Sequence, residues 1–209
     1  MNAEKIRAEL LKYVRRAYFQ DKMFAATSGN LSVFDRASGR MIITPGSYPY
    51  EDMTEDDMVA VDLDGNVLEG CRKPSSEWKL HAAIYRAFPG VNAVVHTHSP
   101  YATSFAINHM AIPVVLYEIA WFLGGDIPVA ESAMPGSPEV GENCVKVLKD
   151  RNGCLMGNHG AVAMGETLAQ AYTRALYIED AAKAYSLALT HGPVKVVESA
   201  EVRRFLGQG

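Results

Sequence analysis

Cysteine is scarce in this sequence, and its placement excludes a disulfide framework. Cys71, Cys144 and Cys154 are an odd number of widely separated thiols, and no CxxC pair occurs. Secreted proteins that depend on disulfides carry dense, paired cysteines, whereas cytosolic proteins keep their thiols reduced. We therefore expect a reduced intracellular protein with a cytoplasmic location.

The sequence also lacks a run of basic charge and a long apolar run. Its 20 Lys and Arg residues are scattered, and the formal net charge is −4. Nucleic-acid and anionic-membrane binding need a basic patch, so we expect neither partner. No stretch is apolar enough to span a bilayer, and the charged N-terminal segment is unlike a signal peptide. The charge pattern is still compatible with a phosphorylated small substrate, because binding one needs only a local anion site.

Several well-known catalytic motifs are absent as well. The GxGxxG and GxxxxGK[ST] patterns do not occur, which excludes the usual glycine-rich nucleotide loops. There is no GxSxG elbow and no HExxH motif. A hydrolytic nucleophile is therefore not favoured.

Helix and strand patterns alternate along the whole chain. Apolar spacing in the first 18 residues predicts an amphipathic helix, and further helices are predicted over 75–88, 99–107, 138–150 and 167–191. Strands are predicted at 31–35, 40–44, 91–98, 112–115 and 127–130, with strand pairs within 58–70 and 153–165. No linker or internal repeat divides these elements. We predict one three-layer α/β/α domain over 1–209 with a mixed, largely antiparallel sheet, and a flexible tail at 200–209.

Two histidines stand one residue apart at the end of a predicted strand. Side chains alternate along a strand, so His96 and His98 should point to the same face. His159, in a turn bracketed by glycines, is a candidate third ligand. Three imidazoles with an open position make a catalytic site for a divalent metal, most often Zn²⁺, although Mn²⁺ or Co²⁺ also suits them. The alternative is half-buried structural histidines, the role expected of the remaining three, His81, His109 and His191.

Glu77 lies in the first turn of a predicted helix for which either preceding serine could be the N-cap. Pro74, three residues earlier, excludes a capping box. A first-turn acid is favoured by the helix dipole, and a surface pair with His81 four residues on is another structural explanation. The functional alternative is a general acid/base beside the metal, or a metal ligand in the resting state.

Three short stretches could hold an anion. The segments TSGN (27–30) and TPGS (44–47) offer hydroxyls and glycine backbone, and Ser75 and Ser76 open a helix whose free N–H groups favour phosphate. Each stretch alone is weak, because turns commonly look like this. Together they suggest an anion site.

These residues resemble the class II aldolase and epimerase (adducin-like) family, which includes L-fuculose-1-phosphate aldolases and L-ribulose-5-phosphate 4-epimerases. The resemblance covers Ala3 to about His191, and it rests on TSGNLSVFD, ITPGSYPYEDM, PSSEWKLH, VVHTHSPYATS, AIPVVLYEIAWFLGGDIPVA and MGNHGAVAMG in order. Related epimerases carry Asp after the two serines, so PSSE favours the aldolases. The turn reads Gly-Ser after TP, where the aldolases usually have Thr-Gly or Ser-Gly, and the tail lacks the tyrosine that the fuculose enzyme uses.

The resemblance implies roles for individual residues. It places zinc on three histidines, with Glu77 as the proton-transfer residue. Tyr117 would reach the site of a neighbouring subunit and serve the leaving aldehyde oxygen, within a C4 homotetramer. The implied metal and phosphate residues are His96, His98 and His159, and Gly29, Asn30, Gly46, Ser47, Ser75 and Ser76.

The expected function is a metal-dependent aldolase. It would reversibly cleave a ketose 1-phosphate, L-fuculose 1-phosphate or a related sugar, to dihydroxyacetone phosphate and an aldehyde through a metal-stabilised enediolate. The alternatives on the same scaffold are an L-ribulose-5-phosphate 4-epimerase and a methylthioribulose-1-phosphate dehydratase. An adducin-like interaction module without catalysis is the alternative from another class.

Overall fold

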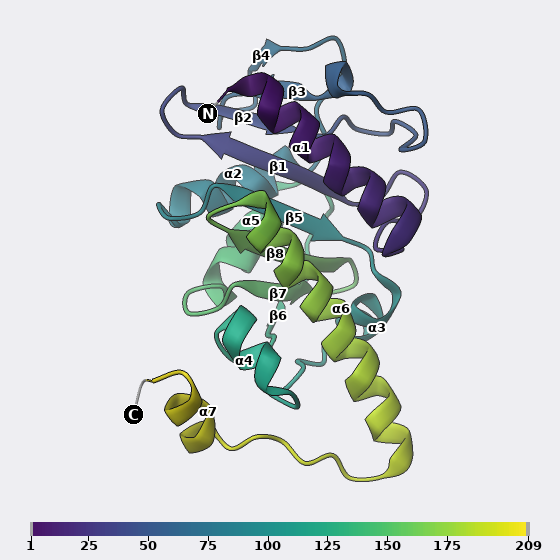
Figure 1. The fold of residues 1–209 in the computed structure, drawn as a ribbon, viewed down its shortest axis with the longest axis vertical. Coiled ribbons are helices and arrows are strands. Elements are labelled where there is room, and N and C mark those ends of the chain that lie inside the picture. Colours follow the sequence, from purple (N-terminus) through teal and green to yellow (C-terminus); the bar gives the residue numbers. More distant parts are fainter. Residues whose placement is uncertain (1, 208–209) are drawn as a thin grey trace.

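A central sheet lies between two layers of helices in the structure, a computed structural model that describes residues 2–207 (Figure 1). The strands are ordered β4-β3-β2-β1-β5-β8-β7-β6, and neighbours are antiparallel except β6 and β7. Their bounds are β1 Asn30–Asp35, β2 Arg40–Ile43, β3 Val59–Val61, β4 Val67–Glu69, β5 Ala93–Thr97, β6 Val129–Ala130, β7 Gly153–Met156 and β8 Gly160–Gly165. The predicted fold class is confirmed.

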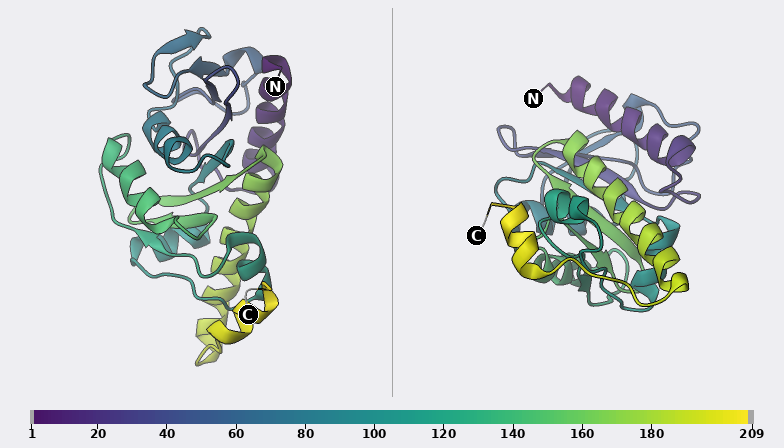
Figure 2. Two further views of the ribbon diagram at one scale, coloured as in Figure 1. Left: turned by 90° about the vertical axis from the view of Figure 1, so that its left-hand side faces the viewer. Right: turned by 60° about the horizontal axis from the view of Figure 1, so that its bottom comes forward.

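Helices cover both faces of this sheet. One face carries α1 (Ala3–Arg15), α3 (Pro100–Ile107), α4 (Tyr117–Leu123) and α6 (Leu168–His191), and α1 continues into a π-helix over Arg16–Gln20. The other face carries α2 (Trp78–Ala87) and α5 (Pro138–Val147). The left view of Figure 2 shows α1 and α6 on one side of the strands and α5 on the other.

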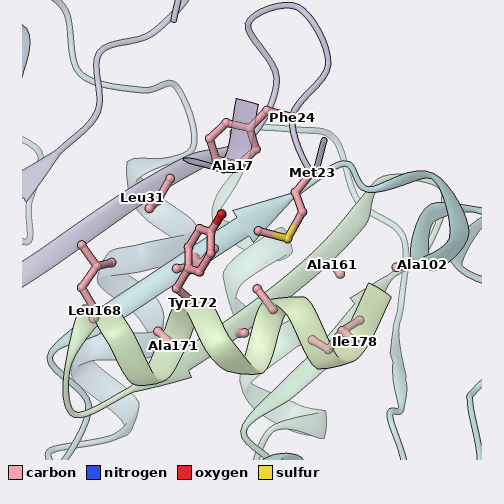
Figure 3. Close-up of a cluster of buried hydrophobic side chains, with 14 of the residues drawn as sticks. Ala17, Met23, Phe24, Leu31, Ala102, Ala161, Leu168, Ala171, Tyr172 and Ile178 are labelled. Carbon is pink, nitrogen blue, oxygen red and sulfur yellow. The ribbon is translucent and has the colours of Figure 1, made fainter. Parts of the chain in front are cut away.

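The core consists of two apolar clusters, one on each face. In β5, Val95 belongs to the cluster under α6, whereas Val94 belongs to the cluster under α2, because successive strand side chains point to opposite faces. Figure 3 shows part of the α6 side, where Tyr172 and Leu168 of the helix lie near Leu31 of β1. A strand buried on both faces needs a continuous apolar run, which explains the sequence before His96. His96 is two residues beyond Val94 in β5, so it lies on the same side of the sheet, the α2 side.

Several predicted boundaries are wrong. Helix α2 begins at Trp78, and Glu77 occupies the N-cap position instead of the first turn, so neither serine is the cap. The strand predicted at 112–115 does not form. Ile112 makes only an isolated bridge with Ile127, and Pro113 has no N–H to extend it. The strand predicted at 127–130 shortens to β6.

The C-terminal segment contains a short helix, α7 (Ser199–Phe205), which lies beside α4 in Figures 1 and 2. The flexibility predicted for 200–209 stays a prediction, and Gln208 and Gly209 lie outside the described residues, as does Met1. None of the helices within 2–207 combines the length and apolar character that crossing a membrane requires.

Candidate active site

The candidate residues lie at the same end of three neighbouring central strands, β1, β5 and β8. Asn30 opens β1 and pairs with His96 near the end of β5, while Thr97 pairs with Ala161 at the start of β8. His98 lies just beyond β5, where its backbone N–H donates to the Met23 carbonyl at 3.1 Å. The strand alternation used to predict that His96 and His98 share a face therefore does not extend to His98, although the two side chains do converge.

His159 reaches the same place from the β7–β8 turn. A Cβ on the next residue, Gly160, would lie 2.3 Å from the carbonyl oxygen of Thr97, so only glycine allows the turn to approach β5 this closely. The close approach of the turn to β5 therefore explains why glycine follows His159.

Three imidazoles and one carboxylate form a compact cluster. The Nε2 atoms of His96 and His98 are 2.9 Å apart, and the ring centroids of the three histidines are 4.7, 4.8 and 5.0 Å from one another. Glu77 places Oε2 at 3.0 Å from the Nε2 of His96 and Oε1 at 3.1 Å from the Nε2 of His159. One ligand atom from each of the four residues lies within 4.8 Å of the others.

These residues fit a divalent cation. His96 holds its Nδ1 at 2.9 Å from the Ala161 carbonyl, so Nδ1 carries a proton and Nε2 is the nitrogen that faces the cluster and could bind a metal. The Oε1 atom of Glu77 is buried and makes no hydrogen bond within the described chain. Imidazole nitrogens with a carboxylate oxygen are ordinary ligands for zinc, and they also suit manganese or cobalt. His96, His98, His159 and Glu77 could therefore hold a divalent metal.

Burial and mutual charge determine the ionisation of the cluster. Burial alone would raise the pKa of the Glu77 carboxyl, but the nearby His96 and His159 outweigh it and hold this pKa well below its usual range. Burial, together with the charge of His96 and His159, lowers the pKa of His98 to about 3. Glu77 is therefore an ionised acceptor and His98 a neutral imidazole at neutral pH, the forms that bind metals.

A cavity of about 410 Å³ opens beside the cluster. All six predicted phosphate-binding residues line it together with Glu77, His98 and His159, and they are Gly29, Asn30, Gly46, Ser47, Ser75 and Ser76. No Lys or Arg is among the described residues that line it. An anion here would be held by hydroxyls, an amide and backbone N–H groups.

Two loops form one wall of this cavity by pairing side by side. The Ser75 N–H donates to the Thr44 carbonyl at 3.1 Å, and the Gly46 N–H donates to the Lys73 carbonyl at 3.0 Å. A Cβ on Gly46 would lie 3.0 Å from the Pro74 carbonyl oxygen, so the close approach favours glycine at this position. Among the hydrogen bonds of residues 2–207, none uses the Ser76 N–H, which leaves a donor at the cavity.

Two residues of the cavity wall, Pro135 and Asn158, lie outside the stretches predicted to hold an anion, whereas Thr27, Ser28 and Pro45 lie within them. Asn158 has a φ of 55°, and its Oδ1 accepts a hydrogen bond from the Nε2 of His109 at 2.7 Å. Asn adopts left-handed backbone more readily than most residues, so its place before His159 in a turn was the available signal.

His81 and Tyr117 differ in their relation to the site. His81 is fully buried and bonds to Asn30 and Ser32, so the surface pair with Glu77 is wrong. Tyr117 does not line the cavity. It lies exposed at the start of α4, where its hydroxyl donates to Glu201 and its ring centroid is 5.0 Å from that of Phe205. Its role in a neighbouring subunit stays a prediction.

The chain is similar to known proteins over nearly its whole length. The model of the class II aldolase and adducin N-terminal domain family matches residues 8–186. The chain is 34% identical over 213 residues to 5-deoxy-D-ribulose 1-phosphate aldolase of Bacillus thuringiensis serovar kurstaki, covering 100% of this chain and 99% of that protein. It is 39% identical over 178 residues to L-fuculose phosphate aldolase of Escherichia coli strain K12, covering 84% and 81%. A solved structure of L-fuculose 1-phosphate aldolase superposes with a TM-score of 0.93 at 35% identity, covering 98% of this chain and 95% of that one.

Proposed function

Because the chain belongs to the class II aldolase and adducin N-terminal domain family, we propose that it is a metal-dependent aldolase of a ketose 1-phosphate. The reaction cleaves the C3–C4 bond reversibly and gives dihydroxyacetone phosphate and an aldehyde. The observation that carries the proposal is the Glu77 carboxylate, which lines the cavity and also touches two histidines of the cluster.

His96, His98 and His159 would hold the cation, with Glu77 as a further ligand before substrate binds. A divalent cation supplies Lewis-acid stabilisation of the negative charge that develops when the bond next to a carbonyl breaks. The three imidazoles would hold it beside the cavity, which His98 and His159 line.

The loops at 27–30, 44–47 and 75–76 would bind the phosphate. Their hydroxyls and backbone donors line the cavity beside Glu77, and the N-terminus of α2 adds a favourable dipole. Binding the phosphate here places the adjacent carbons of the sugar toward the histidines. This orientation is the contribution of the loops to catalysis.

Glu77 would move the proton at C3. In the cleavage direction the C4 hydroxyl loses its proton as the C3–C4 bond breaks, and the protonated Glu77 carboxyl gives a proton to C3. In the condensation direction the ionised carboxylate removes that proton from C3. Its lowered pKa keeps it ionised as the base of the condensation direction. Tyr117 would serve the C4 oxygen in the site of a neighbouring subunit, which requires the C4 homotetramer.

The substrate is proposed as a deoxy sugar phosphate. The relatives are named for L-fuculose phosphate and for 5-deoxy-D-ribulose 1-phosphate, and both sugars end in a methyl group. Cleavage at C3–C4 therefore gives the same phosphate product and a small aldehyde in either case. The difference between the two lies only in the aldehyde half.

The test is release of dihydroxyacetone phosphate from L-fuculose 1-phosphate and 5-deoxy-D-ribulose 1-phosphate, with L-ribulose 5-phosphate in parallel. Each is measured before chelation, after chelation and after zinc is restored. Metal-dependent release supports the aldolase. Conversion of L-ribulose 5-phosphate to its C4 epimer would show that the protein is the epimerase instead. Methylthioribulose 1-phosphate is assayed as well, and loss of water from it would show that the protein is the dehydratase. A protein that binds no metal and turns over none of these would favour the interaction module.

A further inference from the structure

A chain of buried hydrogen bonds runs from the core under α2 to the carboxylate of Glu77. At its far end the Tyr85 hydroxyl lies 2.7 Å from the Ser32 Oγ. The Ser32 Oγ lies 2.6 Å from the Nδ1 of His81, whose Nε2 lies 2.5 Å from the Oδ1 of Asn30. The Nδ2 of Asn30 then lies 3.0 Å from the Oε2 of Glu77. Tyr85, Ser32, His81 and Asn30 are each at most 3% exposed.

The direction of every bond in this chain follows from its last member. An ionised carboxylate only accepts hydrogen bonds, so the Asn30 nitrogen must face Glu77 and the Asn30 oxygen must face His81. That oxygen also only accepts, so His81 must carry its proton on Nε2. In the neutral ring its Nδ1 is then an acceptor for the Ser32 hydroxyl. The Tyr85 hydroxyl faces the Ser32 Oγ and also donates to the Ser32 backbone carbonyl at 3.0 Å. The donors of Ser32, His81 and Asn30 all point toward Glu77.

We propose that His81 is a positioning residue that fixes the amide of Asn30, so that the Asn30 Nδ2–H holds the Glu77 carboxylate at the cavity. Ser32 and Tyr85 fix His81 in turn. The catalytic consequence rests on the proposed function, whereas the tautomer of His81 does not.

Removing the Nε2–H of His81 would free the Asn30 amide to turn over. The Oδ1 of Asn30 would then face the Oε2 of Glu77, and two acceptors at that distance repel each other. Glu77 would lose a donor that counts for more because the site is buried. The second N–H of the Asn30 amide is available to a ligand in the cavity, which Asn30 lines. Rotation of the amide would move this donor away from the cavity as well.

Apolar packing alone does not explain the chain. The neighbours of Tyr85 on this face, such as Leu80 and Ile84, form an apolar cluster in which leucine could replace a histidine of purely structural use. Buried polar groups are costly unless they are bonded, and here each bond leads to the next group and ends at the proposed catalytic residue. The geometry therefore favours a positioning role.

The first experiment reads the tautomer directly. Protein labelled with ¹⁵N-histidine and loaded with zinc is examined by two-bond ¹⁵N–¹H NMR, and the His81→Gln variant assigns the His81 signals by their loss. We expect Nε2 protonated and Nδ1 unprotonated. A proton on Nδ1 would overturn the proposal, because Asn30 would then face the wrong way.

The second experiment uses variants that differ at the Nε2 position. His81→Gln keeps an amide N–H near that position, whereas His81→Leu has none. For each variant kcat is normalised to bound zinc, which removes the effect of misfolded protein. We expect His81→Leu to lower kcat about 10–100-fold, as changes behind a metal site commonly do, with KM for the sugar phosphate changed much less. His81→Gln should recover most of the loss.

Arg86→Gln, at an exposed position of the same helix, is the matched control because Arg86 takes no part in the chain of buried bonds. Its kcat should stay close to the wild type. Wild-type kcat in His81→Leu, or equal loss in His81→Gln and His81→Leu, would overturn the positioning role. If the wild type releases no dihydroxyacetone phosphate, the proposed function fails, and the tautomer measurement still decides whether the chain exists.

Discussion

His96 donates its Nδ1–H to the carbonyl oxygen of Ala161 across the β5–β8 ladder at 2.9 Å. Strand pairing itself thus keeps a proton on the Nδ1 of this histidine and turns its Nε2 toward His98 and His159. The ligand is prepared by the backbone before any cation arrives.

Replacing His96 with alanine should therefore remove bound metal and activity together. The remaining imidazoles and carboxylate form an incomplete site, and a missing ligand weakens binding steeply. Metal content per chain is measured after dialysis against limiting chelator, alongside product release. His191→Ala, at the exposed end of α6, is the control and should keep both. Full metal-dependent activity in His96→Ala would show that the site is wrongly assigned.

Glu77→Gln should separate metal binding from catalysis. The amide keeps an oxygen near the cluster but cannot accept the proton at C3, and a positioned acid/base typically contributes about 10²–10⁴-fold. We expect a loss of that size in kcat with metal content retained. Glu142→Gln, on the exposed face of α5, is the matched control. Unchanged kcat in Glu77→Gln would remove this residue from the mechanism.

Ser75→Ala and Ser76→Ala should weaken substrate binding through the phosphate. A hydrogen bond to a charged group contributes about 1.5–3 kcal/mol, so KM should rise about tenfold or more. The effect should be absent for binding of the free aldehyde, which has no phosphate. Ser104→Ala, exposed in α3, should leave KM unchanged. A fall in kcat at constant KM would place the serines elsewhere in the reaction.

Stability should fall in acid because of His81. Burial, with a contribution from His96 that Glu77 opposes, lowers the pKa of His81 from 6.5 to about 3. The unfolded chain therefore binds a proton as pH drops below 6.5, whereas the folded chain does not until about pH 3. The stabilisation is present above pH 6.5 and is lost toward pH 3, by up to about 1.4 kcal/mol per pH unit.

The measurement is urea unfolding of the metal-free protein between pH 7 and pH 4. His98 titrates in the same direction, so the wild type is compared with His81→Gln, which keeps His98 and has no group at 81 to protonate. The wild type should lose stability more steeply than the variant. Parallel curves would show that His81 does not stay neutral in the fold.

Gly160→Ala should destabilise the protein by displacing the β7–β8 turn from β5. The added Cβ would meet the Thr97 carbonyl at 2.3 Å, and backbone yields less easily than a flexible side chain. Overpacking typically costs about 1–3 kcal/mol. Gly90→Ala, whose Cβ meets nothing within 4 Å, is the control in denaturant unfolding. Equal stability of the two variants would contradict the close approach seen here.

The layers, the sheet type and the convergence of Glu77 with three histidines could be predicted from the sequence. The apolar run before His96 and the glycines around His159 have direct physical causes, so their patterns were informative. The start of α2 was not informative, because Ser75 lies in a turn before the helix, where its Oγ accepts from the Glu77 N–H and its own N–H donates to the Thr44 carbonyl. This turn depends on the Thr44 loop, which is remote in sequence.

The role of His81 could not be predicted either. Its spacing from Glu77 suggested a surface pair, but the outcome depends on which face of α2 is buried and on Ser32 of a distant strand. Asn158 was missed for a similar reason, since its partner His109 belongs to another turn. Local patterns identify elements and ligands, whereas the groups that orient them come from tertiary contacts.

The four candidate ligands belong to segments that meet only when α2, β5 and the β7–β8 turn are assembled. An unfolded chain offers no such set, so the free energy of metal binding adds to that of folding. Metal supply would then set how often the chain opens and is exposed to proteases. The lifetime of the protein in a cell should depend on its metal even when no sugar phosphate is present.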